Sequence, residues 1–192
     1  PRGSAAEGWL RRADAALLSL RQQTEAAPDP IMRVQVEDVD GQAAGVVADL
    51  HRLAGQVTVV DQALAGIDAG RLGQRAAQLR QEAATSVGAL HDEKQRAVRA
   101  VEDQIQVFER LVGVRQTQLA RMESAVLGLE GLAARLAELV ALRLASGTVE
   151  TSASRLAELT GGLDGLRAGL AETEELSRRL LASAAPEESR GA

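Results

Sequence analysis

The sequence predicts an all-α protein built from long antiparallel helical hairpins, in an elongated, coiled-coil-like bundle of about four helices. Apolar residues recur at alternating steps of three and four along most of the chain, which places them on one face of a helix. Hydrophobic residues make up 45% of the sequence, but aromatic residues only 1%. Leu, Val and Ala suit a narrow seam between helices better than a thick globular core, because a seam needs small, repeated side chains.

The first expected helix is short and amphipathic and spans residues 5–26. Residues 1–4, Pro-Arg-Gly-Ser, match the end of a common cleavable tag, so we interpret them as a cloning scar on a fragment of a longer protein. Pro28 and Pro30 are expected to end this helix, since proline cannot continue it. The apolar stripe consists of Leu10, Ala13, Leu17 and Leu20.

Residues 29–146 are expected to form a long helical hairpin. Asp29 and Pro30 suit the cap and the first position of a helix. The apolar residues that follow keep the alternation of three and four up to Ile67, which a strand cannot produce. We therefore expect a helix to about Ile67, a reversing turn at residues 68–70, and a return of the chain along the next helix.

The second arm of this hairpin is expected to be one helix from Arg71 to about Ala145. Its apolar seam changes register near residue 97, which we interpret as a stutter within a continuous helix. The open alternative is a break at Gly88 or Gly113 and a compact bundle. The second half of the apolar seam consists of Val101, Ile105, Phe108, Val112, Arg115, Leu119, Met122, Val126, Leu129, Ala133, Leu136 and Val140.

A last helix is expected over residues 148–185, folding back on the second half of the hairpin. Ser146, Gly147 and Thr148 supply a helix stop and a new cap. Residues 186–192 are expected to be a polar tail. We take the whole as one elongated domain.

Composition excludes several classes of partner and function. The 22 basic and 27 acidic residues are interspersed, and the net charge is −5, so no basic face for nucleic acid is expected. No run approaches the roughly 18 apolar residues of a membrane span, although peripheral membrane contact stays open. Lys94 stands alone among 21 arginines, a bias typical of a high-GC, bacterial genome, and we expect a cytoplasmic location.

No catalytic, cofactor-binding or metal-binding residues are predicted, so we do not expect an enzyme. His51 and His91 lack a second ligand at helical metal spacing. Gly161 and Gly162 are not followed by the Lys-Ser/Thr pair of a phosphate-binding loop.

Gly161, Gly165 and Gly169 form a strip on one face of the last expected helix and are candidates for an interaction surface. Each costs about 1 kcal/mol of helix stability relative to Ala, so the strip suggests the close approach of another backbone. On that interpretation Gly165→Ala destabilises the protein, which is the result we expect. If the glycines merely dilute helix propensity, the same change stabilises it by about 0.5–1 kcal/mol.

Two further interaction candidates are Arg115 and Trp9. Arg115 occupies a seam position, where it either fixes register and partner number or extends past the seam to solvent. Trp9 lies on the first amphipathic helix, which either packs against the hairpin or rests on a membrane surface. Packing is the better interpretation, because acidic residues offset the arginines of this helix.

By elimination, the expected function is a non-enzymatic scaffold or interaction module that binds another protein, or oligomerises, through its helical seams. From Trp9 to about Asp38, a short amphipathic helix and an Asp-Pro break precede a long helical hairpin, and this architecture resembles the phage-shock/ESCRT-III-like membrane remodellers. The resemblance implies membrane-surface remodelling as the alternative, but the single Lys and the absence of a basic first helix depart from that pattern. A third expectation is a sensor of a small anionic ligand that uses arginines across helices.

Overall fold

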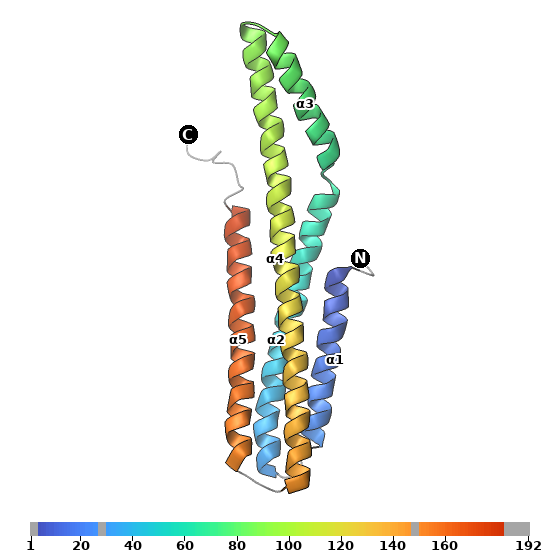
Figure 1. Ribbon diagram of the computed structural model, residues 1–192, viewed down its shortest axis with the longest axis vertical. Coiled ribbons are helices and arrows are strands. Elements are labelled where there is room, and N and C mark those ends of the chain that lie inside the picture. Colours follow the sequence, from blue (N-terminus) through green and yellow to red (C-terminus); the bar gives the residue numbers. More distant parts are fainter. Residues whose placement is uncertain (1–3, 27–29, 147–149, 183–192) are drawn as a thin grey trace. The chain divides into compact units, whose positions relative to one another are not determined.

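The computed structural model describes residues 4–26, 30–146 and 150–182, with side chains described at 4–26, 36–142 and 154–180. These residues form five helices and no strand (Figure 1). The helices are α1 (Ala5–Glu25), α2 (Pro30–Ala65), α3 (Ala69–Thr85), α4 (Ala89–Ser146) and α5 (Glu150–Ala182). The all-α helical bundle predicted from the sequence is confirmed, with five helices where about four were expected.

Several sequence-based boundaries lie outside the described residues. They are most of the supposed tag remnant, the proline break before α2, the stop and cap before α5, and the polar tail from residue 186. Ser4 is described, and its hydroxyl oxygen accepts a hydrogen bond of 3.2 Å from the backbone N–H of Glu7. Ser4 is therefore the N-cap of α1, because it satisfies one of the free N–H groups of the first turn.

The chain divides into two compact units. Unit 1 comprises Pro1–Thr58 and Thr117–Arg178, and unit 2 comprises Val59–Gln116 and Arg179–Ala192. α2, α4 and the end of α5 contribute residues to both units.

Unit 1 packs segments of four helices, α1, α2, α4 and α5 (Figure 1). Polar pairs between the helices show their directions: α1 runs antiparallel to α2, α2 runs parallel to α5, and α5 runs antiparallel to α4. α1 and α4 are consequently parallel neighbours. The pairs are Asp14–His51 and Arg21–Asp40, Asp49–Arg167 and Gln56–Glu174, Arg121–Thr173, and Arg12–Glu130.

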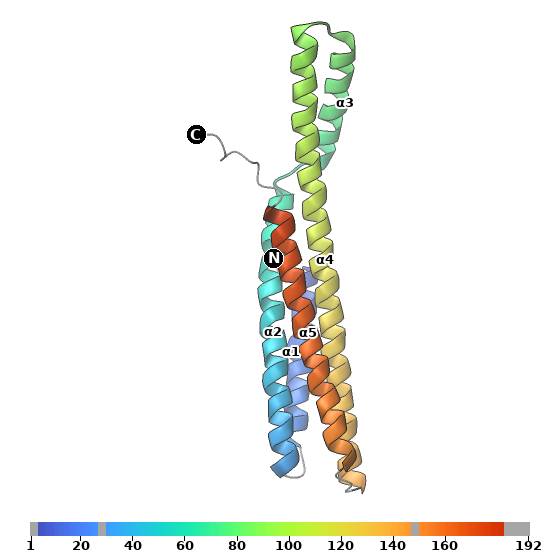
Figure 2. The same ribbon diagram turned by 90° about the vertical axis from the view of Figure 1, so that its left-hand side faces the viewer.

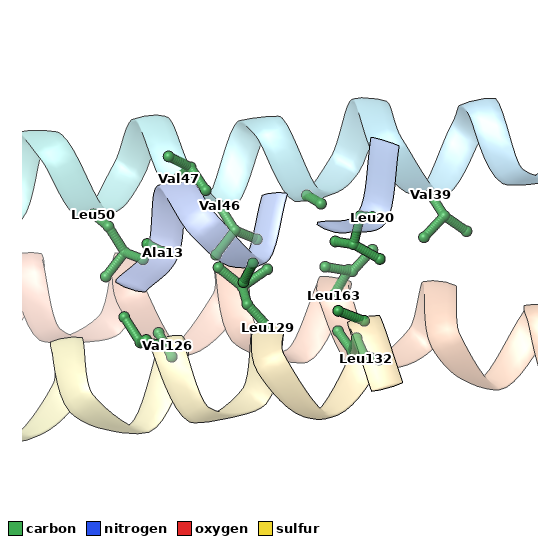
Figure 3. Close-up of a cluster of buried hydrophobic side chains, with 14 of the residues drawn as sticks. Ala13, Leu20, Val39, Val46, Val47, Leu50, Val126, Leu129, Leu132 and Leu163 are labelled. Carbon is green, nitrogen blue, oxygen red and sulfur yellow. The ribbon is translucent and has the colours of Figure 1, made fainter. Parts of the chain in front are cut away.

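The core of unit 1 consists of aliphatic side chains from all four of its helices. Figure 3 shows Leu20 of α1, Val46 of α2, Leu129 of α4 and Leu163 of α5 pointing toward a common centre, and each is 0% exposed. The seam predicted for α4 is confirmed in this unit, where its positions from Met122 to Val140 are buried. These positions are Met122, Val126, Leu129, Ala133, Leu136 and Val140.

Unit 2 is an antiparallel hairpin of α3 and the first part of α4, which lie side by side in Figure 2. Arg80 of α3 pairs with Glu102 of α4, and nearer the turn Glu82 pairs with Lys94. The chain reverses at residues 86–88, where Gly88 has φ +58°, the only positive φ among the described residues. Glycine fits this position because a Cβ strains the left-handed conformation.

The structure corrects two expectations about this hairpin. The helix expected from Arg71 to Ala145 is broken at Gly88, one of the two alternatives, and it continues through Gly113. The register change near residue 97 lies within α4 and not at this break. Separately, the reversing turn expected at residues 68–70 is wrong, because the chain does not reverse between α2 and α3.

α3 instead follows α2 along the same partner helix. Asp61 of α2 pairs with Arg115 of α4, and farther along the chain Arg80 of α3 pairs with Glu102. Asp68 lies between the two helices and is the N-cap of α3. Its side chain accepts a hydrogen bond of 2.9 Å from the backbone N–H of Arg71, so α3 begins directly after the short link.

Leu129→Asp tests the buried seam of unit 1. Leu129 is 0% exposed, so a carboxylate there loses its hydration without gaining a partner, and the free energy of unfolding should fall by about 3 kcal/mol or more. Leu127→Asp is the matched control, because Leu127 is 51% exposed and its replacement should change stability by less than about 0.5 kcal/mol. Equal losses in urea denaturation would contradict the assigned face.

Candidate functional site

The described residues contain no group of three or more His, Cys, Asp and Glu side chains that could hold a metal ion. His51 lies at the surface with Nε2 at 3.3 Å from Oδ1 of Asp14, and Nδ1 of His91 is 2.9 Å from the carbonyl oxygen of Ala83. Both histidines thus contribute to contacts between helices. Across the same part of the chain, no helix combines the length and the apolar character needed to span a membrane.

The five candidates from the sequence lie on three helices, and the structure does not bring them together into one site. Trp9 is on α1, Arg115 on the unit 2 part of α4, and the glycine strip on α5. Each therefore has to be considered in its own surroundings.

Trp9 is half-buried and packs against the core of unit 1. The guanidinium carbon of Arg12 lies 4.8 Å from the centre of its ring, a cation–π distance. Arg12 also donates two hydrogen bonds, of 2.8 and 2.6 Å, to the carboxylate of Glu130 on α4. These contacts attach α1 to the bundle, and the hydrogen bond from Arg12 lowers the pKa of Glu130 below its ordinary value, against the opposing effect of desolvation.

Arg115 reaches past the seam of α4 to an ion pair with a neighbouring helix. Its Nε donates a hydrogen bond to the carboxylate of Asp61 on α2, and about a third of the Arg115 side chain stays exposed. Arg115 thus extends past the seam, and its role in fixing register or partner number stays a prediction.

The glycine strip of α5 faces open space along most of its length. A Cβ added at Gly161 or Gly165 would meet no described atom within 4 Å, and one at Gly169 would lie 3.2 Å from the guanidinium carbon of Arg121. No neighbouring backbone approaches the strip among the described residues, so the expected destabilisation by Gly165→Ala has no basis within the chain. Its use by another molecule stays a prediction.

Close packing through glycine occurs elsewhere, between α4 and α5, at two positions that the sequence analysis did not select. A Cβ at Gly128 would lie 2.8 Å from Cδ2 of Leu166, and one at Gly162 would lie 3.3 Å from Cδ2 of Leu132. A leucine of each helix thus packs against a glycine of the other. Spacing alone could not find them, because neither belongs to a run of regularly spaced glycines.

The most distinctive surface feature of unit 2 is an apolar groove of about 470 Å³ between its helices. We call it the α3–α4 groove. Its exposed lining is mostly apolar, although Asp68, Arg71, Arg75 and Gln104 also contribute to it. The lining residues are Gly66, Ile67, Asp68, Arg71, Leu72, Arg75, Gln104 and Val107.

The apolar seam of α4 is only partly covered in unit 2. Its large side chains are half-buried there, and Val107 beside them lines the groove. The buried residues of α3 mostly have small side chains: they are Ala76, Leu79 and Ala83. The half-buried seam residues are Val101, Ile105, Phe108 and Val112.

No protein-family model, curated protein or solved structure matches the chain. Function must therefore be inferred from the residues and contacts of this chain itself.

Gly165→Ala is now expected to stabilise the protein by about 0.5–1 kcal/mol, since the methyl group meets open space and alanine favours the helix. Gly128→Ala is the matched comparison and should be less stable than Gly165→Ala by about 1 kcal/mol or more, because Leu166 must move. Thermal melts at two protein concentrations measure both. Destabilisation by Gly165→Ala that grows with protein concentration would instead show that the strip binds a second copy of the chain.

Glu130→Gln tests the attachment of α1. The pKa of Glu130 is lower in the folded chain than in the unfolded chain, so its contribution is present above the unfolded value and is lost as the pH falls through the folded one. The variant should lose about 0.2–1 kcal/mol at about pH 7, the range of exposed ion pairs, and this loss should shrink as the pH falls through the folded pKa of Glu130. Urea denaturation over a series of pH values measures this, and a loss that is independent of pH would contradict the ion pair.

Proposed function

We propose that the chain is a non-enzymatic helical scaffold that binds a further helix through the partly covered seam of unit 2. The observation that supports this is the change in burial along α4. The seam is buried from Met122 to Val140 in unit 1, but Ile105 and Phe108 of unit 2 are only half-buried.

The energetic reason is the apolar area left in contact with water. Burying apolar surface contributes about 25 cal/mol per Å², so several half-buried Val, Ile and Phe side chains can supply several kcal/mol to an association. Large apolar side chains on consecutive turns suit an amphipathic helix as the binding partner, since its own side chains recur at the same spacing.

Membrane-surface remodelling remains the alternative function. It requires the apolar face of α1 to meet lipid, yet this face is directed into unit 1, where Ala13 and Leu20 are 0% exposed. Leu18 is the exposed large apolar residue of the helix, at 57%. One exposed leucine on a helix without a basic excess favours the scaffold over the membrane proposal.

Co-purification from the source organism tests the scaffold proposal, with Val107→Glu as the variant bait. Val107 lines the groove, and a charge there should abolish binding of an apolar helix. Leu18→Glu on α1 is the control and should retain the partners of the unchanged chain. Identical partners for both baits, or none, would contradict the proposal, and flotation of the protein with anionic liposomes would favour the alternative.

A further inference from the structure

We infer that the α3–α4 groove binds an acidic amphipathic helix of another protein, whose apolar residues fill the groove while its carboxylates pair with Arg71 and Arg75. This inference rests on the proposed function, because it identifies the chemistry of the helix that unit 2 binds. It follows from the charges that line the groove and from the way in which α5 covers the same face of α4 in unit 1.

The charged residues that line the groove leave basic groups without acidic partners. Arg71 is exposed, and its side chain makes no hydrogen bond or ion pair with any described residue. Asp68 is the acidic residue of the lining, but its carboxylate already accepts the hydrogen bond that caps α3. A helix that fills the groove therefore has to supply the carboxylate for Arg71 itself.

Arg75 offers a second basic group to the same helix. Its Nη1 donates a hydrogen bond of 3.0 Å to the neutral side chain of Gln78 and lies 4.0 Å from Oε1 of Glu82. A guanidinium has five N–H groups, so Arg75 keeps donors for a further carboxylate. Arg71 and Arg75 are four residues apart and share one face of α3, so two acidic residues one turn apart on the bound helix would match them.

α5 shows how a helix covers this face of α4 in unit 1. Val107, which lines the groove, belongs to a stripe of α4 residues at alternating steps of four and three. The stripe consists of Val107, Leu111, Val114, Gln118, Arg121, Ala125, Gly128 and Leu132. Four of these residues contact α5, in the pairs Gln118–Ser177, Arg121–Thr173, Gly128–Leu166 and Leu132–Gly162. No residue of α5 lines the groove, so the stripe is available to another helix at Val107.

The charges of α5 match the arginines around it. Glu172 of α5 lies 3.5 Å from Arg121 of α4, and Glu174 lies 3.5 Å from Arg52 of α2. Acidic residues thus flank the part of α5 that packs on the stripe. α3 follows α2 along α4, and its arginines offer the same kind of partner to a helix in the groove.

Two synthetic helical peptides test the inference by fluorescence anisotropy with the intact chain. Both carry leucine at alternating steps of three and four and alanine elsewhere, with flanking residues of glutamate in one peptide and lysine in the other. The glutamate peptide should bind about tenfold more tightly, because two ion pairs favour it. The net charge of −5 opposes this order, so nonspecific attraction cannot produce it. Val107→Glu should abolish binding.

Charge reversal locates the pairing. Arg71→Glu combined with Arg75→Glu should reverse the order, so that the lysine peptide binds more tightly than the glutamate peptide. Arg99→Glu combined with Arg110→Glu is the matched control, because it changes the net charge equally at two exposed residues of α4 outside the groove lining. The control should keep the original order. A variant that had failed to fold would not gain affinity for the lysine peptide, so a reversal reports the groove itself.

The outcomes separate this inference from the proposed function. Equal affinities, or a preference for the lysine peptide, overturn the acidic partner and keep the scaffold if Val107→Glu abolishes the binding. The same conclusion follows if neither peptide binds but a co-purifying protein is still lost by Val107→Glu. Self-association in sedimentation equilibrium that Val107→Glu abolishes would replace the acidic helix with a second copy. If neither peptide binds and no partner or second copy depends on Val107, both proposals are overturned.

Discussion

The apolar seam of α4 is the constraint on which both units depend. In unit 1 it lies among α1, α2 and α5, and its side chains are buried with those of all three helices. In unit 2, α3 and the last turns of α2 are the described helices beside it, and Ile105 and Phe108 stay half-buried. Because a continuous helix repeats its apolar positions regardless of what covers them, the number of neighbours decides how much of the seam meets water.

Polar residues within unit 1 limit how its helices can slide along that seam. Gln118 of α4 is 1% exposed, and its Nε2 lies 3.3 Å from Oε1 of Gln56 and 3.4 Å from Oγ of Ser177. Arg121, one turn farther along, donates to the carbonyl oxygen of Gly169 and to Thr173 on α5. Leucines of similar shape could pack in several registers, whereas a shifted register would leave the buried amide of Gln118 without these partners, at a cost of about 1–3 kcal/mol.

Periodicity predicted the buried positions of α2 and of α4 in unit 1, because the spacing of apolar residues is itself the geometric cause of burial. It did not locate the reversal of the hairpin. Gly70 and Gly88 both follow helical stretches, and what separates them is backbone conformation, with a positive φ only at Gly88. The same limit applies to the glycine strip: spacing places Gly161 and Gly165 on one face, but which face meets a neighbour depends on the packing of α5 against α4. The α3–α4 groove involves the same difficulty, since Leu72 and Val107 come together only once the reversal is placed.

The degree to which the α4 seam is buried also determines how much a bound helix would stabilise each unit. The described core of unit 2 is thin, so opening it exposes little apolar surface and costs little free energy. It consists of Val60 of α2, Ala76, Leu79 and Ala83 of α3, and Val98 and Val114 of α4. A ligand that binds only the closed hairpin stabilises it by mass action, and the thinner the core, the larger the share of its stability that comes from binding. Under the proposed function, the bound helix would supply a large share of the stability of unit 2, whereas unit 1 obtains its stability from its own four helical segments.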